Sequence, residues 1–280
     1  MPLINRLCVS GALREDLSEN TEKEALHLYS YQNIDQGQDM ADADLVKMFR
    51  GLMADDDLAK MFRGLILDKR VYPPKIVCLP LLAFETVENL ISEAEFRISH
   101  KEQILEASVK MDGTSIVMAC YQGRVVVATK NRFKSRRVDL VKAILQARRI
   151  TESAFRENHT YICEYIGGPN CRVINYPFEG LCLLTVIDNL TGFELDYESR
   201  RSMADSLGFI TPATVWFTPT SSFGDVINHF SGIYGDIEGV VVRTPDACCL
   251  ETESEPFSKM IGIKSIQLKR RMSSGLEIPL

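Results

Sequence analysis

The chain has 280 residues, of which 45% are hydrophobic, and its 32 Lys and Arg against 38 Asp and Glu give a formal net charge of −6 at pH 7. This length and apolar content indicate a globular protein with one sizeable domain or two small ones. The apolar runs are too short to span a membrane, and the first residues lack the charged-then-apolar order of a signal peptide, which excludes the membrane and secreted classes. We therefore expect a soluble intracellular protein, in the cytoplasm or, for a viral protein, in the host-cell cytoplasm.

Hydrophobic periodicity and turn residues divide the chain into strands and helices. In chain order the pattern predicts strands at 25–31 and 65–67, a helix at 84–99, strands at 115–120 and 125–129, a helix at 138–150, strands at 161–166 and 181–188, helices at 197–207 and 221–233, and a strand at 237–242. The first 24 residues read as a polar lead-in. Because hairpins mix with helices and no strand–helix–strand rhythm occurs, the pattern predicts the α+β class rather than a parallel doubly wound sheet.

The most informative motif is Lys110-Met111-Asp112-Gly113-Thr114, which directly precedes the predicted hairpin. A lone Lys-x-Asp-Gly is usually a turn, since Asp-Gly is a strong turn dipeptide. The motif is more specific when it is taken together with Glu164 and Glu238, which follow it inside apolar strands. A carboxylate in such a strand is costly to bury unless it binds something. Together these residues predict a nucleotidyl-transfer site.

Each part of this set suits that chemistry. A lysine that attacks the α-phosphate of a nucleotide must lose its proton, which burial and neighbouring cations promote. Gly113 permits a tight turn or a close approach of backbone to a phosphate, and Asp112 offers an oxygen ligand for Mg²⁺, usually through water. Lys130 and Lys264 would neutralise phosphate oxygens. No Walker A or dinucleotide-binding fingerprint occurs in the sequence, so nucleotide binding depends on these residues.

The ordered set resembles the covalent nucleotidyltransferases, which are the ATP-dependent DNA and RNA ligases and the mRNA capping guanylyltransferases. Within this family the chain is most similar to RNA ligases of the phage RNA ligase 1 type, over roughly residues 25–266. The resemblance implies the nucleotidyltransferase, or adenylation, fold of mainly antiparallel sheets with flanking helices. It places the amino-terminal part of the adenylation domain at 1–95, the core with the motifs at 96–270 and a tail at 271–280, with no separate carboxyl-terminal domain.

The resemblance also implies a role for each residue of the set. Lys110 is the nucleophile that becomes covalently adenylylated. Glu164, in the third motif, contacts the ribose and a metal-bound water. Glu238, in the fourth motif, holds the hydration shell of Mg²⁺ together with Asp112. Lys264, in the fifth motif, contacts the α-phosphate.

Three further residues are implied near the nucleotide. Lys130 occupies the position of a triphosphate-contacting lysine after the first hairpin, while Tyr31 and Arg63 lie in Ser-Tyr and Arg-Gly-apolar elements. The segment around Arg63 is a near-copy of the segment around Arg50, which makes Arg50 the alternative. Arg63 is favoured because an apolar strand follows it, as in the family.

Two positions depart from the family pattern. Gly262 stands where the fifth motif usually carries its first lysine, and Ala83 stands near a position where another lysine is common. Two fewer cations weaken the neutralisation of a triphosphate. Lys259 or Lys269 is the alternative source of that charge.

Two basic clusters, residues 130–137 and 264–271, flank the predicted site. Such runs also suit a solvated helix face. Their position favours a path for RNA phosphates, since a local patch rather than the net charge makes phosphate contacts.

The resemblance predicts ATP-dependent ligation of RNA 5′-phosphate and 3′-hydroxyl ends, through a lysyl-AMP and a 5′-adenylylated RNA, with ATP and Mg²⁺, or Mn²⁺ in its place, as cofactors. It implies no membrane partner, and a protein partner is one source of substrate choice. Two alternatives stay open. One is a guanylyltransferase or DNA ligase that uses the same lysine, and the other is a degenerate, non-catalytic nucleotide- or RNA-binding protein.

Overall fold

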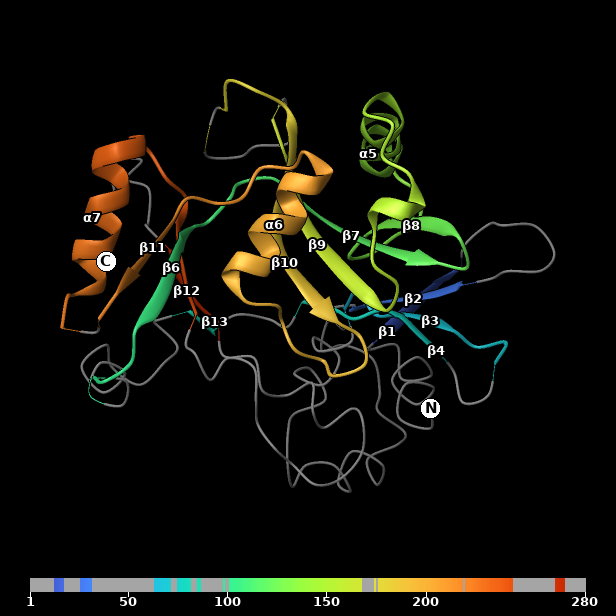
Figure 1. The fold of residues 1–280 in the computed structure, drawn as a ribbon, viewed down its shortest axis with the longest axis horizontal. Coiled ribbons are helices and arrows are strands. Elements are labelled where there is room, and N and C mark those ends of the chain that lie inside the picture. The colour runs from blue at the N-terminus through green and yellow to red at the C-terminus, as the bar shows by residue number, and fades with distance from the viewer. Residues whose placement is uncertain are drawn as a thin grey trace, which may run out of the picture. The chain divides into compact units, whose positions relative to one another are not determined.

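The computed structural model describes residues 13–17, 26–31, 63–71, 75–81, 85–86, 98, 101–167, 174, 176–218, 220–243 and 265–269 (Figure 1). In chain order its strands are β1 (Leu13–Leu17), β2 (Leu26–Tyr31), β3 (Ile66–Asp68), β4 (Lys75–Cys78), β5 (Glu85–Thr86), β6 (Leu105–Val109), β7 (Thr114–Tyr121), β8 (Arg124–Thr129), β9 (His159–Ile166), β10 (Gly180–Asp188), β11 (Thr214–Phe217), β12 (Gly239–Arg243) and β13 (Ser265–Lys269). The helices of the described ranges for which bounds can be given are α5 (Arg136–Ala147), α6 (Tyr197–Leu207) and α7 (Phe223–Tyr234), and a 3₁₀ turn lies at Glu152–Ala154.

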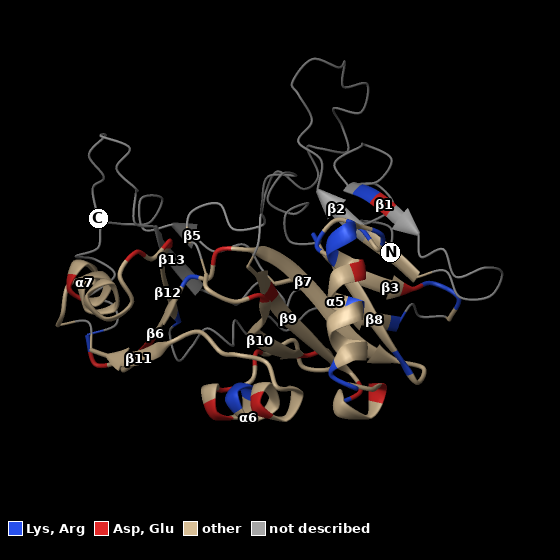
Figure 2. Cartoon of the chain, turned by 90° about the horizontal axis from the view of Figure 1, so that it is seen from above, with Lys and Arg blue, Asp and Glu red and all other residues tan. Residues whose placement is uncertain are grey.

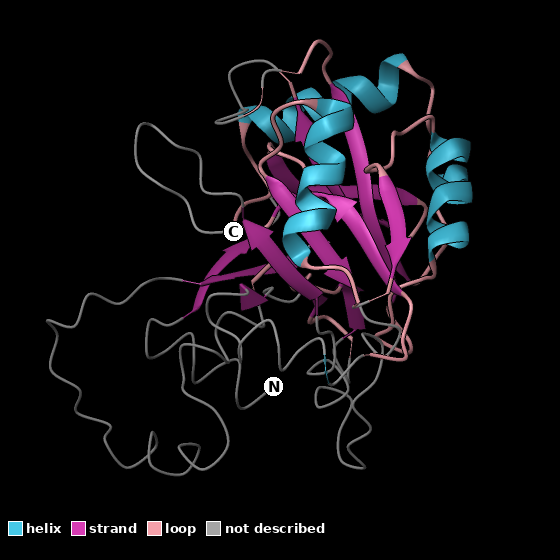
Figure 3. Ribbon diagram, turned by 90° about the vertical axis from the view of Figure 1, so that its left-hand side faces the viewer, coloured by secondary structure: helices cyan, strands magenta, loops and turns pink. Residues whose placement is uncertain are grey.

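The described strands form three sheets, with the orders β1-β2-β3-β4, β10-β9-β7-β8 and β11-β6-β12-β13-β5. Strand pairs such as β7 with β8 and β6 with β12 are antiparallel, whereas β13 and β5 are parallel. Helices flank the sheets (Figure 3). The predicted α+β class of mainly antiparallel sheets with flanking helices is therefore confirmed.

The chain forms two compact units. The first comprises Met1–Ala83, Ile116–Ile162 and Ile187–Leu190, and the second comprises Phe84–Ser115, Cys163–Val186 and Thr191–Leu280. Strands β7, β9 and β10 contribute residues to both units.

The first unit contains the β1–β4 sheet, the β7–β8 hairpin and α5. Helix α5 begins at Ser135, whose hydroxyl accepts a hydrogen bond from the Val138 N–H and so satisfies one unpaired donor of the first turn. Its buried residues, Val138, Val141 and Leu145, recur at the spacing of one helix face. The predicted helix at 138–150 thus exists and begins two residues earlier.

The second unit places α7 against one face of β6 and β12 (Figures 1 and 3). The buried residues of this core are Leu105 and Ala107 from β6, Val240 and Val242 from β12, Ile237, and Phe223, Val226, Ile227 and Phe230 from α7. A capping box fixes the start of α7, because the Ser222 side chain accepts from the Asp225 N–H and the Asp225 side chain accepts from the Ser222 N–H.

Helix α6 begins and ends where the sequence predicts. Asp196 caps its start and accepts a hydrogen bond of 2.7 Å from the Ser199 N–H. This hydrogen bond holds the pKa of the Asp196 carboxyl below its usual range. Gly208 ends the helix in the left-handed region, with φ of 63°, which favours glycine.

Three local expectations are corrected. Glu85–Thr86 forms β5, parallel to β13, so the predicted helix at 84–99 does not begin at its first turn; most of the remaining positions lie outside the described residues. The polar lead-in contains β1, which its antiparallel pairing with β2 stabilises despite a weak alternation of side chains. Glu238 directly precedes β12 instead of lying within it.

The segment around Arg50 also lies outside the described residues. None of the helices in the described ranges has the length and apolar character of a membrane span.

Candidate active site

Lys110 and Glu238 are brought together by two neighbouring strands. Lys110 directly follows β6, and its backbone N–H donates a 2.8 Å hydrogen bond to the carbonyl oxygen of Gly239, the first residue of β12. Its amine forms an ion pair with the Glu238 carboxylate. The two side chains are 19% and 22% exposed, so the pair is partly withdrawn from water and still reachable by a ligand.

Gly113 brings Glu164 to the same segment. A Cβ atom on Gly113 would lie 2.3 Å from the carbonyl oxygen of Tyr165 and 3.0 Å from Cγ of Glu164. No real Cβ tolerates the first distance, so only glycine lets the turn after Lys110 pack on β9. The sequence predicted either a tight turn at Gly113 or a close approach of its backbone to a phosphate, and the structure shows a close approach to the backbone of β9.

Asp112 is buried, with 5% exposure, and hydrogen bonds fix its position in the turn. Its backbone N–H donates a 3.0 Å hydrogen bond to the Tyr176 hydroxyl. Its carboxylate Oδ2 accepts a 2.8 Å hydrogen bond from the Ile174 N–H. Tyr176 was not predicted, because a tyrosine in a loop beside a proline carries no motif that links it to a residue so far away in the chain.

Buried thiols lie in the strands around Glu164. Cys163 on β9 and Cys182 on β10 are fully buried. Burial raises the pKa of both thiols, and the nearby Glu164 carboxylate raises the pKa of each further. The two cysteines therefore stay uncharged and add no second nucleophile beside Lys110.

Arg63 and Lys130 meet in the first unit. The Arg63 Nε–H donates a 2.9 Å hydrogen bond to Oδ1 of Asn131, which follows Lys130. Gly64 lies against Lys130, since a Cβ on this glycine would be 3.7 Å from Cα of Lys130. Burial lowers the pKa of the Arg63 guanidinium, although an arginine keeps its charge at neutral pH. Tyr31 is the last residue of β2 and is the register partner of Leu13.

Lys264 lies outside the described residues. The strand that follows it, β13, pairs antiparallel with β12 and places Ser265 opposite Arg243 and Lys269 opposite Gly239. Lys269, on β13, therefore lies opposite the first residue of β12, at the end of β12 where Glu238 and Lys110 meet.

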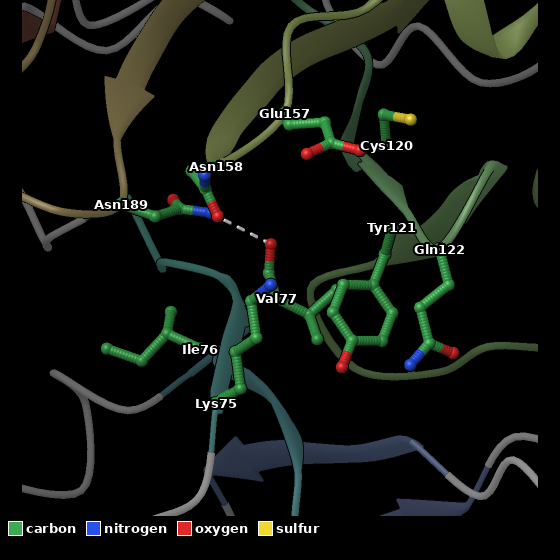
Figure 4. Close-up of a pocket in the computed structure, with 9 residues that line it drawn as sticks. All are labelled: Lys75, Ile76, Val77, Cys120, Tyr121, Gln122, Glu157, Asn158 and Asn189. Carbon is green, nitrogen blue, oxygen red and sulfur yellow. Dashed lines mark hydrogen bonds between the residues drawn. The ribbon is translucent and has the colours of Figure 1, made fainter.

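A cavity in the first unit is too small for a nucleotide. It lies between β4, the β7–β8 turn and the bend at Asn158, and Asn189 donates a 3.0 Å hydrogen bond to the Val77 carbonyl oxygen beside it (Figure 4). Its space of about 20 Å³ admits about one water molecule, whereas ligand pockets start at about 300 Å³. This cavity is therefore sized for water.

Comparison with protein families gives a match over more than half of the chain. The family model described as RNA ligase matches residues 61–264, which include Lys110, Glu164, Glu238 and Lys264. The chain therefore belongs to the RNA ligase family. Comparison with the curated proteins gave no match.

Solved structures share the fold. An archaeal ATP-dependent RNA ligase is similar with a TM-score of 0.57 and 15% identity, covering 95% of this chain and 60% of that one. A variant of the Naegleria gruberi RNA ligase, solved with ATP and Mn, has a TM-score of 0.50 and 15% identity, covering 66% and 54%. An Aquifex aeolicus protein provisionally assigned as an ATP-dependent DNA ligase has a TM-score of 0.55 and 12% identity, covering 96% and 62%. The chain thus spans about three fifths of the archaeal ligase that it resembles.

Proposed function

We propose that the protein is an ATP-dependent RNA ligase that works through a lysyl-AMP and then a 5′-adenylylated RNA. The observation that carries the proposal is the meeting of Lys110 with Glu238, next to the turn in which Gly113 packs on Glu164 and Tyr165. This arrangement occurs within the part of the chain that matches the RNA ligase family.

In the first step, the amine of Lys110 attacks the α-phosphorus of ATP. A nitrogen–phosphorus bond forms, the bond to the β-phosphate oxygen breaks, and pyrophosphate leaves with the electron pair while the amine loses its proton. The partly buried ion pair with Glu238 would hold the amine at one place. Because an ammonium group has no free electron pair, the Glu238 carboxylate would take its proton before the nitrogen attacks. Lys130, Arg63, Tyr31 and Lys264 would contact the nucleotide, in the roles that the resemblance implies.

The next two steps transfer AMP and seal the RNA. An oxygen of the RNA 5′-phosphate attacks the phosphorus of lysyl-AMP, and Lys110 leaves as the amine. The 3′-hydroxyl of the other RNA end then attacks the activated 5′-phosphate, and AMP departs. These steps require RNA ends to lie beside Lys110, and its partial exposure leaves room for them.

The carboxylates of Asp112, Glu164 and Glu238 fit a magnesium ion held through water. Among the described residues, no three His, Cys, Asp or Glu side chains lie close enough to hold one metal ion directly. Mg²⁺ usually keeps several of its waters, so carboxylates that orient those waters suffice, and Mn²⁺ would fit the same donors. When bound, the ion would neutralise phosphate charge.

The RNA would approach over the basic loop, which we define as residues 130–137. Figure 2 shows Lys and Arg on α5 and on the chain that leads into it. The five cations of this loop, Lys130, Arg132, Lys134, Arg136 and Arg137, are all exposed. The loop is held firmly, because the Thr129 hydroxyl accepts from the Asn131 and Arg132 N–H groups and Phe133 is buried. A protein partner that selects the RNA is also proposed.

Lys110→Ala tests the proposal directly. The unaltered chain, incubated with ATP labelled at the α-phosphate, should gain the mass and label of one AMP, and Lys110→Ala should gain neither. Lys101→Ala is the matched control, because Lys101 lies in the same unit with its side chain 71% exposed beside Glu102. Label that survives Lys110→Ala would reject Lys110 as the nucleophile.

The same assay separates the alternatives. Labelling by GTP instead of ATP would indicate a guanylyltransferase, and sealing of nicked DNA in preference to RNA would indicate a DNA ligase. An unaltered, folded chain that takes up no label from either nucleotide would indicate a non-catalytic binding protein.

A further inference from the structure

We propose that the partly buried ion pair of Glu106 and Arg243 fixes the register of β6 against β12, and that this register holds Lys110 beside Glu238. Glu106 and Arg243 are then positioning residues, which act on the reaction through the two strands. The importance of this register for AMP transfer rests on the proposed function, whereas the register itself does not.

One register connects the ion pair with the site. In the antiparallel pairing of β6 with β12, Glu106 is the partner of Arg243 and Val109 is the partner of Val240. The next residue along, Lys110, donates its N–H to Gly239. The alignment that joins the charges at one end of the two strands is therefore the alignment that joins Lys110 to Glu238 at the other.

The apolar residues of these strands do not define this register by themselves. The middle of β12 is Val240-Val241-Val242, and all three valines are buried. A slip by two residues would put one of these valines in the place of the other and bring Glu238 or Thr244 to the position left open, and a slip by one would bring Val241 to the face that packs against α7. The three consecutive valines therefore distinguish these alignments less than a strand of alternating apolar and polar residues would, and a further interaction adds to the choice of register.

The charged residues supply this distinction. Arg243 is only 9% exposed, and its Nη1 lies 3.3 Å from Oε1 of Glu106. The same nitrogen donates a 3.2 Å hydrogen bond to the Ser108 hydroxyl, while the Arg243 Nε lies 3.3 Å from Oε2 of Glu194. A slip in either direction would separate Arg243 from Glu106 and Ser108, and the loss of contacts around a buried charge is unfavourable.

Ion pairs of this kind specify structure better than they stabilise it. Replacement of a buried ion pair by apolar residues is often neutral or stabilising, and the best-attested use of buried polar groups is to fix register.

Arg200 provides a matched control inside the same network. Its Nη2 lies 2.5 Å from Oε2 of Glu106, and Arg200 is 5% exposed, so it is as buried as Arg243 and shares its carboxylate. Arg200 belongs to α6, however, and not to β12. Its loss disturbs the same charges without removing the link between the two strands.

Engineered disulfides measure the register without any need for activity. The pair Val109→Cys with Val240→Cys joins register partners, and the pair Ala107→Cys with Val240→Cys is out of register by two residues. Out-of-register Cβ atoms lie too far apart for a disulfide. Under mild oxidation only the first pair should close in the presence of Arg243. With Arg243→Met the second pair should close as well, and with Arg200→Met it should stay open.

The rate of AMP transfer to Lys110 gives the second readout. At saturating ATP, Arg243→Met should lower this rate by about tenfold to a hundredfold, since misplacement by about 1 Å has effects of this size. Arg200→Met should change it by less than about threefold. Oxidation of the pair at 109 and 240 should restore the rate of Arg243→Met, which a general loss of stability would not predict.

The outcomes are decisive in each case. An out-of-register pair that stays open with Arg243→Met, or closes equally with Arg200→Met, would overturn the register role. If Arg243→Met does not fold, Arg243→Lys, which keeps the charge but loses the forked contacts, is measured in the same way. Absence of AMP transfer in the unaltered chain would reject the proposed function and leave the disulfide comparison intact.

Discussion

Gly113 and Tyr165 approach each other so closely that no side chain fits between them. A Cβ atom on Gly113 would lie 2.3 Å from the Tyr165 carbonyl oxygen. That oxygen belongs to the backbone of β9 and cannot rotate away as the end of a side chain would. Any larger residue at 113 must therefore displace either β9, which carries Glu164, or the turn that follows Lys110.

We predict that Gly113→Ala lowers the free energy of unfolding by about 1–3 kcal/mol, the usual effect of overpacking, and reduces AMP transfer because Glu164 moves away from the turn. Urea unfolding and labelling with ATP measure the two effects. Gly180→Ala is the control, since a Cβ on Gly180 meets no atom within 4 Å. Equal stability of the two variants would contradict the close packing of Gly113.

Lys269 is predicted to supply the positive charge that Gly262 lacks. The register of β13 places Lys269 opposite Gly239, at the end of β12 that carries the Lys110–Glu238 pair. Lys269→Ala should weaken ATP binding by about tenfold or more, since a charge-assisted contact contributes about 1.5–3 kcal/mol. The ATP concentration that gives half-maximal AMP transfer measures this loss.

Two further variants test this assignment. Lys269→Arg, which keeps a positive charge at this strand position, should retain ATP binding. Lys259→Ala, the other source of charge in the sequence, should have little effect. A larger loss from Lys259→Ala than from Lys269→Ala would show that Lys269 is the wrong choice.

Local signals explain the features that the sequence predicts well. Helix α6 begins after Asp196 and ends at Gly208 because a capping carboxylate and a left-handed glycine each act within one turn. The β7–β8 hairpin follows from apolar runs on both sides of Gln122-Gly123, and both of these turn residues have positive φ. Such interactions join near neighbours, so the sequence alone contains them.

Contacts between distant segments explain what the sequence does not reveal. Three contacts each depend on which distant segments become neighbours: the hydrogen bond from Asp112 to Tyr176, the parallel pairing of β5 with β13, and the joining of Glu106 to both Arg200 and Arg243. Each of these residues on its own also suits an exposed position. The sequence grouped Lys110 and Glu238 into one site through the type and setting of the residues and then through the resemblance, but it did not predict their direct ion pair, because no local pattern brings these two segments together.

The buried cysteines should make the protein less stable at alkaline pH. Burial raises the pKa of the thiols of Cys78, Cys163 and Cys182 in the folded chain, whereas an unfolded thiol has a pKa of about 8.5. Below that pH both states keep the proton and stability is unaffected. Above it the unfolded state loses protons first, so each thiol lowers the free energy of unfolding by about 1.4 kcal/mol per pH unit.

Urea unfolding at a series of pH values between about 8 and 10 measures this slope. Cys163→Ala should reduce the slope by the share of one thiol, whatever its effect on stability at neutral pH. Iodoacetamide should modify these cysteines only after unfolding, because the thiolate is the reactive form. An unchanged slope in Cys163→Ala would mean that Cys163 ionises as readily in the folded chain as in the unfolded one.

Part of the affinity for RNA should depend on the cations of the basic loop at 130–137. Arg132→Ala, Lys134→Ala and Arg136→Ala together should weaken binding of single-stranded RNA and flatten its dependence on salt, because each phosphate contact contributes about 0.7 to the logarithmic slope and three contribute about 2. The control removes three exposed cations from the rest of the same helix and the residues just after it, Lys142, Arg148 and Arg149. Net charge changes equally in both triple variants, so a slope that flattens only in the first assigns the contacts to the loop. Equal slopes in the two variants would mean that RNA responds to overall charge and does not dock at this surface.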